Sequence, residues 1–301
     1  MILIADSGST KTDWKLLHSA HPQLGYDLVA SFQTQGITPI HQTAADIRKI
    51  LEQELIHQFS TFPRAKLFEM GGLGMSLFHD MNIFFYGSGC TPAHIPMMKQ
   101  LLTEVLSAKT VEVHSDLMAA ARALCGTEPG IACILGTGAN SCLYDGHDIV
   151  QNTPALGYIL GDEGSGSVLG RRFLTALFKH PDMAALRDEF LESQKLTLPQ
   201  IIQHVYREPM ANRWLASLSP FIQQHLSVPQ VRELVVDNFR QFFRMNVKPY
   251  KHTDLPVSFV GSMAFYYPDE LAEAARAEGY TVGQVMQSPI EGLVAYHQQQ
   301  P

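Results

Sequence analysis

The sequence has no apolar run that approaches the length of a membrane span, and its start, Met1–Ala5, lacks the basic residues of a signal peptide. Cysteine is scarce, and the four residues at positions 90, 125, 133 and 142 form no C-x-x-C pair, which argues against a zinc site. The 13 histidines show no metal-ligand spacing either. We therefore expect a cytoplasmic protein with free, buried thiols and no membrane partner.

Basic residues are in the minority, because 22 Lys and Arg stand against 29 Asp and Glu, for a net charge of −7. They are scattered, whereas a nucleic-acid site needs a basic patch, so we expect no nucleic-acid partner. The 301 residues contain no low-complexity linker, and a hydrophobic content of 46% is ample for two cores. We expect an N-terminal domain over 1–112 and a C-terminal domain over 113–301, with the final helix a candidate to pack back on the first domain.

Residues 2–17 predict a strand, a tight turn and a second strand. The turn, Ser7–Thr10, is small, polar and centred on Gly8, so its consecutive backbone N–H groups can form an anion nest, and Lys11 adds a positive charge. Asp6, at the end of the first strand, is a candidate ligand for Mg²⁺, which takes only one or two carboxylates. Phosphates with Mg²⁺ are the expected ligand; the alternative is that Asp6 and Ser7 serve only the turn.

This hairpin matches neither of two common phosphate motifs. A Walker A loop needs a glycine directly before the lysine, and here Lys11 follows Thr10. A Rossmann fingerprint needs a helix after the glycines, and here a second strand follows.

Further along, apolar periodicity predicts alternating strands and helices, which is typical of an α/β fold. We expect further strands over 26–32, 67–70, 83–86, 111–113, 131–135 and 256–260. We expect helices over 43–59, 92–106, 115–124, 183–191, 198–206, 211–225, 229–245, 269–278 and 289–297, with Thr43 as an N-cap.

Three stretches in the second half of this pattern carry chemistry. Asp116 opens a helix, where its carboxylate is either an N-cap or a general base at the mouth of a cleft. The turn at 136–138, between apolar strands, repeats the first hairpin and indicates duplicated halves that face one another. Asp162 and Glu163 lie among glycines; they form either a binding loop for a polyhydroxyl ligand or a solvated acidic loop.

With these motifs assembled, the chain resembles the BadF/BadG/BcrA/BcrD ATPase family and, within it, the N-acetylglucosamine kinase-like proteins of the sugar kinase, Hsp70 and actin superfamily. The resemblance covers nearly the whole chain, and its motifs are Asp6–Thr12, Ser115–Ala120, Leu135–Ser141 and Gly157–Gly166. It implies a two-domain actin-like ATPase fold of the ribonuclease H type, in which duplicated mixed sheets flank a nucleotide cleft.

The resemblance also implies roles for individual residues, with Asp116 as catalytic base and Asp6 as the Mg²⁺ ligand. ATP would be bound by Asp6, Gly8, Ser9, Thr10, Lys11, Gly136, Thr137, Gly138, Ala216 and Gly261. The sugar would be contacted by Thr38, Asp116, Asn140, Ala155, Leu156, Gly157 and Asp162. The family usually has asparagine where this chain has Thr38, whose side chain is shorter and lacks the amide.

We therefore expect ATP-dependent phosphorylation of an amino sugar, N-acetylglucosamine to its 6-phosphate, with a homodimer as a candidate assembly. One alternative is an activator ATPase of 2-hydroxyacyl-CoA dehydratases, but that needs cysteines at strand ends, and Cys133 and Cys142 lie inside strand patterns. Another is a nucleotide-dependent sensor of the Hsp70 kind, which would need neither Asp116 nor the Asp162 loop.

Overall fold

The computed structural model describes residues 1–19, 25–62, 78–79 and 81–299; the strand expected over 67–70 lies outside these ranges. Its contacts divide the chain into two compact units, residues 1–126 with 289–301, and residues 127–288. The first unit runs past residue 112, where the sequence pattern placed the boundary. The reason is that strand β5 (Thr110–Ser115) pairs along its length with β4 (Asn82–Gly87).

The first unit contains a five-stranded mixed sheet of order β3-β2-β1-β4-β5. The strands β1 (Ile2–Ser7), β2 (Lys11–His18) and β3 (Asp27–Gln35) form an antiparallel meander, whereas β4 and β5 run parallel to β1. The apolar run at the start of the chain thus becomes the central strand, paired on both sides.

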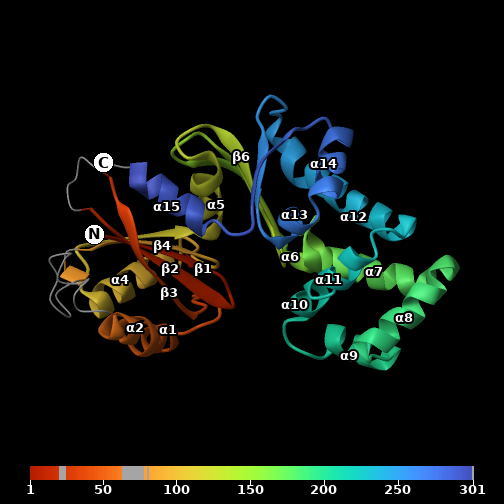
Figure 1. Ribbon diagram of the computed structural model, residues 1–301, viewed down its shortest axis with the longest axis horizontal. Helices are drawn as coiled ribbons and strands as arrows, with labels where there is room; N and C mark the ends of the chain where they lie inside the picture. Colours follow the sequence, from red (N-terminus) through yellow and green to blue (C-terminus); the bar gives the residue numbers. More distant parts are fainter. Residues whose placement is uncertain (20–24, 63–77, 80, 300–301) are drawn as a thin grey trace. The chain divides into compact units, whose positions relative to one another are not determined.

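Side-chain alternation along β1 supplies both faces of this sheet, as the pleat of a strand requires. Leu3 and Ala5 pack with one group of helices, and Ile2 and Ile4 pack with another. The first group is α1 (Ala44–Ile50), α2 (Ile56–Thr61) and α4 (Ile95–Leu106); the second is α5 (Asp116–Cys125) and α15 (Ile290–Gln299) (Figure 1). A π-helical turn over Leu51–Leu55 joins α1 to α2, and Thr43 caps α1 as expected.

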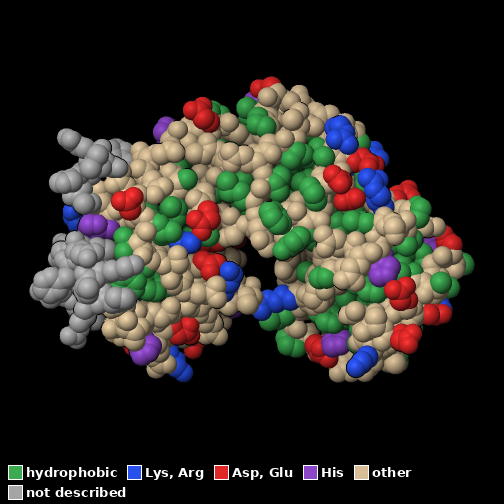
Figure 2. Space-filling model, in the orientation of Figure 1, with side chains coloured by type: hydrophobic (Ala, Val, Ile, Leu, Met, Phe, Trp, Pro, Cys, Tyr) green, Lys and Arg blue, Asp and Glu red, His purple; other side chains and the backbone are tan. Residues whose placement is uncertain are grey.

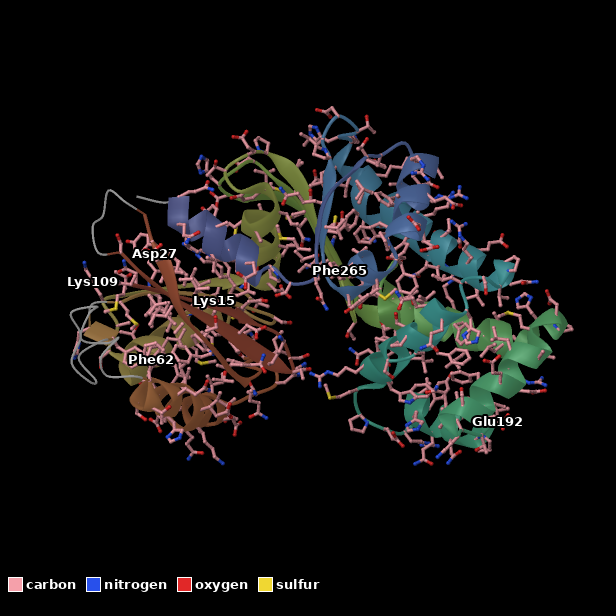
Figure 3. The ribbon with its side chains drawn as sticks, viewed as in Figure 1. Lys15, Asp27, Phe62, Lys109, Glu192 and Phe265 are labelled. Carbon is pink, nitrogen blue, oxygen red and sulfur yellow. The ribbon has the colours of Figure 1, made fainter. Side chains whose placement is uncertain are left out.

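Helix α15, from the C-terminal end of the chain, belongs to the first unit. It packs against α5, where a Cβ on Gly292 would lie 2.7 Å from the backbone oxygen of Ala123. Lys15 of β2, labelled in Figure 3, reaches the same helix and pairs with Glu291 at 2.6 Å. The two ends of the chain therefore build one core.

The second unit repeats the topology of the first. Its sheet has the order β10-β9-β6-β7-β8, with β6–β7–β8 as the antiparallel meander and β9 and β10 parallel to β6. The strands are β6 (Gly130–Leu135), β7 (Ala139–Tyr144), β8 (Ile149–Thr153), β9 (Val257–Val260) and β10 (Val282–Met286). The expected duplication of mixed sheets is confirmed in both strand order and direction.

The helices of the second unit pack against its sheet and form one large hydrophobic core with it, in which Phe173, Phe239 and Phe259 are fully buried. The helices are α6 (Gly157–Leu160), α7 (Gly166–Lys179), α8 (Ala184–Gln194), α9 (Leu198–Tyr206), α10 (Ala211–Ala216), α11 (Ser219–Gln224), α12 (Pro229–Phe242), α13 (Ser262–Tyr266) and α14 (Pro268–Ala277). The single helix expected over 211–225 is two, because the chain breaks before Pro220, which occupies the first turn of α11. Within the described ranges, every helix is too short or too polar to cross a membrane.

Candidate active site

The first glycine hairpin joins β1 to β2 and is exposed. Gly8 N–H donates to the carbonyl of Lys11 at 3.0 Å, which closes the turn. A Cβ on Gly8 would meet only the oxygen of Lys11, at 3.8 Å, and the φ angle of Gly8 is not positive. The backbone therefore does not need glycine at this position for its own conformation, and the open space beside Gly8 lets a ligand approach the backbone closely.

Two carboxylates share one face of the sheet beside this hairpin. Asp6 lies directly opposite Asp13 in the antiparallel register of β1 and β2, so both side chains point to the same face. Asp13 pairs with the ammonium of Lys11 at 2.7 Å. No group of three or more potential metal ligands occurs among the described residues, and Mg²⁺ needs only one or two carboxylates with water. Asp6 and Asp13 fit that ion.

The loop after β3 carries Thr38, which is 7% exposed. Its backbone N–H donates to the side-chain oxygen of Gln42 at 2.7 Å, and the Gln42 amide donates to the carbonyl of Gly36 at 2.9 Å. Within the part of the chain that the structure describes, the buried Thr38 hydroxyl has no hydrogen-bond partner. A buried polar group without a partner is costly, and a ligand hydroxyl would satisfy it.

Asp116 is the first residue of α5, directly after β5. The N-cap is Ser115, whose hydroxyl accepts the N–H of Met118 at 3.2 Å, so the interpretation of Asp116 as the cap is wrong. Burial raises the pKa of the Asp116 carboxyl to about 6, although the Leu117 N–H and the Ser88 hydroxyl donate to it and act in the opposite direction. A carboxyl group that titrates near neutral pH suits general base catalysis.

In the second unit, the hairpin at 136–138 is held by the start of α7. The N–H groups of Gly166 and Ser167 donate to the carbonyls of Gly136 and Thr137 at 2.8 and 3.2 Å. Nothing lies within 4 Å of the position that a Cβ on Gly136 would take, so this turn is as open as the first. The two hairpins thus share strand order, turn composition and free space.

Asp162 lies against this second hairpin. A Cβ on Gly138 would be 3.0 Å from the Asp162 carboxylate, which also accepts the N–H groups of Ala139 and Gly157. Burial raises the pKa of Asp162, and the charge of Glu163 adds to that shift. Asp162 also has a φ of 54°, a left-handed conformation that is uncommon outside glycine and is often found at functional sites.

Two residues expected at the adenosine also lie near this hairpin. Gly261, with a φ of 121°, follows β9, and a Cβ there would lie 2.2 Å from the carbonyl of Leu135, so only glycine fits. Ala216 lies at the end of α10, where its Cβ and the Met263 sulfur are 3.1 and 3.2 Å from the Cβ position of Gly166. Phe265 of α13, labelled in Figure 3, is 44% exposed.

The remaining expected sugar residues are less closely tied to the hairpin. Asn140 lies on β7, where its side-chain oxygen accepts the amide of Asn152 at 2.9 Å. Ala155 is exposed, and Leu156 is 59% exposed. Gly157 begins α6 with a φ of 76° and donates to Asp162. The structure therefore gathers Gly157 and Asp162 at the hairpin but leaves the side chain of Leu156 open.

The chain resembles a solved structure in both sequence and fold. No family model and no curated protein matches the chain. Among solved structures, the putative N-acetylglucosamine kinase of Porphyromonas gingivalis is 44% identical to this chain, with a TM-score of 0.86 and 99% of each chain covered. The chain belongs to the N-acetylglucosamine kinase-like family.

Two more distant structures show how widely the fold of this family is shared. The putative N-acetylglucosamine kinase of Chromobacterium violaceum is 19% identical, with a TM-score of 0.70 over 98% of each chain. MreB 5 of Spiroplasma citri is 10% identical, with a TM-score of 0.54 over 99% of this chain and 96% of its own. The expected two-domain actin-like ATPase fold is confirmed.

Sequence reasoning missed two polar residues of this kinase-like chain that the structure places beside expected ones. Ser88 donates to Asp116, and Asp13 lies opposite Asp6. The Gly-Ser-Gly ending of the strand at 83–86 was the available signal for Ser88, and the symmetric register of the first hairpin was the signal for Asp13. On the face shown in Figure 2, Lys and Arg side chains lie singly or beside acidic ones, and no extended basic patch is visible.

Proposed function

We propose that this protein is an ATP-dependent kinase that transfers the γ-phosphoryl group to the 6-hydroxyl of N-acetylglucosamine. Asp116 carries the proposal, because it is a carboxylate at the start of a helix, is not used as the cap, and titrates near pH 6. The name of the 44% identical relative, a putative N-acetylglucosamine kinase, supports the choice of sugar.

In the proposed reaction, Asp116 accepts the proton of the 6-hydroxyl while the hydroxyl oxygen forms a bond to the γ-phosphorus. The bond from the γ-phosphorus to the bridging oxygen breaks, and ADP leaves with that electron pair. Backbone N–H groups of the hairpin at 7–10 stabilise the charge on the phosphates, and the hairpin at 136–138 of the second unit carries donors of the same kind. Asp6, with Asp13 opposite, would hold Mg²⁺, which supplies charge neutralisation. The AMPPNP bound to MreB 5, which shares the fold, is consistent with ATP as the nucleotide.

In this proposal, Thr38 of the first unit and Asp162 of the second unit are each candidates to contact a sugar hydroxyl. The raised pKa of Asp162 and the unpartnered hydroxyl of Thr38 both reflect polar groups that are partly withdrawn from water. Sugar hydroxyls can donate to a carboxylate and can either donate to or accept from a threonine, so they satisfy both groups. A hydroxylated substrate therefore suits each of these two residues better than an apolar one.

The experiment is a coupled assay of ADP release across N-acetylglucosamine, N-acetylmannosamine, glucosamine and glucose, with the phosphorylated position read by NMR. We expect turnover that depends on N-acetylglucosamine, a 6-phosphate product and an inactive Asp116→Asn control. ATP hydrolysis that is the same with and without sugar would refute the proposal.

The activator ATPase alternative is disfavoured by the cysteines. Cys133 and Cys142 are fully buried inside β6 and β7, Cys90 is 2% exposed, and Cys125 is partly exposed. One partly exposed thiol is fewer than the two that each subunit must supply to a four-cysteine cluster shared by two subunits. An iron assay on protein purified without oxygen separates the two functions. The candidate homodimer stays a prediction, which light scattering on the eluted protein tests.

A further inference from the structure

Ser7 ends β1, is 1% exposed, and makes contacts far from its own turn. Its hydroxyl donates to the carbonyl of Ile37 at 2.9 Å and accepts the N–H of Ile37 at 3.0 Å. The Ser7 hydroxyl therefore bonds both backbone polar groups of Ile37 and joins the loop that carries Thr38 to the central strand β1. A serine that served only the first hairpin would instead bond to residues within that turn.

The hydroxyl protons around Ser7 can be assigned so that every partner is satisfied. The Ser7 oxygen lies 2.6 Å from the Thr12 hydroxyl, which is also 3.1 Å from the carbonyl of Gln35. Each hydroxyl has one proton. The Thr34 hydroxyl can donate to the Gln35 carbonyl, also at 3.1 Å. The Thr12 hydroxyl can therefore donate to the Ser7 oxygen, while the Ser7 hydroxyl donates to the carbonyl of Ile37. This directional chain fixes the orientation of the Ser7 side chain.

The backbone of Ser7 holds a second loop. Its carbonyl accepts the N–H of Ser88 at 2.9 Å, and the Ser88 hydroxyl donates to Asp116. The next residue, Gly89, has a φ of 80°, and a Cβ there would lie 3.2 Å from the methyl group of Thr38. The loop beside Asp116 and the loop of Thr38 thus contact each other as well as Ser7.

The same loop also lies directly on the first glycine hairpin. Gly36 N–H donates to the carbonyl of Thr10 at 3.1 Å, and a Cβ on Gly36 would lie 2.4 Å from the carbonyl oxygen of Gly8. Residue 36 must therefore be glycine for the loop to approach this closely. Three short segments, at 8–10, 36–38 and 88–90, converge on Ser7.

We propose that Ser7 is a positioning residue that holds Thr38 and the Ser88–Asp116 pair at fixed distances from the phosphate hairpin. This inference rests on the proposed kinase function, because that function assigns the sugar to Thr38, the proton to Asp116 and the phosphates to the hairpin. The Ser7 hydroxyl is bonded to Ile37 and Thr12, so its role is to hold other residues in position. It acts by keeping the acceptor hydroxyl in line with the phosphorus, where a misplacement of about 1 Å costs roughly a hundredfold in rate.

The test is Ser7→Ala, which leaves the N–H and carbonyl of Ile37 buried without their partner. We expect kcat/KM for the sugar to fall about 10- to 100-fold, while the KM for ATP changes less than about threefold. Amide hydrogen exchange over 36–38 and 88–90 should become at least about tenfold faster. The exchange readout needs no activity, so it still tests Ser7 if the wild-type protein phosphorylates no sugar and the proposed function fails.

Ser258→Ala is the matched control, because Ser258 is also a buried serine, at 5%, and its hydroxyl accepts a backbone N–H, that of Gln284 at 3.1 Å, within the second unit. It should lower the melting temperature but leave the kinetics and the exchange at 36–38 and 88–90 unchanged. The proposal is overturned if Ser7→Ala behaves like Ser258→Ala, or if only the KM for ATP rises. Should Ser7→Ala not fold, Ser7→Cys, with a weaker donor and acceptor, should show the same pattern at smaller amplitude; wild-type kinetics in that variant would also overturn it.

Discussion

Replacing Thr38 with valine should stabilise the free protein and weaken sugar binding. Valine has the shape of threonine without the hydroxyl, so the methyl contact with the Gly89 backbone is kept. The hydroxyl that is lost is buried and has no partner among the described residues. Burying such a group costs about 1–3 kcal/mol, so its removal should recover a part of that, roughly 1 kcal/mol, or about 2–4 °C in the melting temperature.

The sugar complex should respond in the opposite direction. If the Thr38 hydroxyl bonds to the sugar, valine removes a neutral hydrogen bond worth roughly 0.5–1.5 kcal/mol, which raises the Kd for N-acetylglucosamine about two- to twelvefold. Titration calorimetry with the sugar alone measures this change, and scanning calorimetry without ligand measures the stability. Thr34→Val is the control for stability: its hydroxyl has two partners, so this variant should destabilise the protein.

Two results would refute this reasoning. If Thr38→Val destabilises the free protein as Thr34→Val does, the Thr38 hydroxyl has a partner in the absence of sugar. If Thr38→Val is more stable but binds the sugar with wild-type affinity, Thr38 lines no sugar site. Thr38→Asn, which restores the residue usual in the family, should show whether the amide extends the range of sugars accepted.

Three further predictions concern other parts of the site and the core. Asp116→Asn should lower kcat by roughly 10²–10⁴, and the acid limb of kcat/KM in the wild type should have its midpoint near pH 6. The pKa of Asp116 in the folded protein lies above the ordinary value of 3.8, so between pH 3.8 and about 6 the native state binds one proton more than the unfolded state and loses stability as pH rises. By denaturant titration, Asp116→Asn should therefore be more stable than the wild type at pH 7.5, by at most about 3 kcal/mol, and equally stable near pH 3. Asp162→Ala should raise the sugar KM roughly 10- to 150-fold and the ATP KM little, and equal damage to both would mean a structural loop. Gly292→Ala places a Cβ 2.7 Å from the Ala123 oxygen and should cost about 1–3 kcal/mol in urea unfolding with kcat unchanged; an unaltered midpoint would mean that α15 can move away from α5.

The sequence predicted the central strands and both edge strands of the first sheet, but it missed the edge strands of the second sheet, for a physical reason. β1, β6 and β9 are buried on both faces and appear as short apolar runs. The edge strands β8 and β10 are partly exposed along their length and carry polar residues, as in Ile149–Thr153, so no apolar run marks them. Edge strands of this kind are defined by pairing with a neighbour, which a local pattern does not record.

The candidate site residues also divide into those that a local sequence pattern marks and those that only strand pairing brings together. Motifs whose members adjoin in sequence, such as Gly136–Gly138, could be proposed from composition alone. The contacts of Ser7 with Ile37 span 30 residues, and Ser88 reaches Asp116 from the neighbouring strand end. Such contacts depend on which strands pair and in what register, so patterns within single segments can propose ligand-binding residues but not the residues that hold them in position.

At the start of α5, the strand pairing decides whether Ser115 or Asp116 is the N-cap. Serine and aspartate are almost equally good N-caps, so Ser115-Asp116 leaves the cap undecided by propensity. In the fold, Ser115 pairs with Gly87 as the last residue of β5 and has the extended conformation, with φ −71° and ψ 160°, that an N-cap needs. The strand pairing therefore assigns the cap to Ser115 and makes Asp116 the first helical residue. Ser115 satisfies the N–H of Met118, and the Asp116 carboxylate accepts the N–H of Leu117 without being the cap. Because burial raises the pKa of this carboxyl to about 6, it can accept a proton near neutral pH.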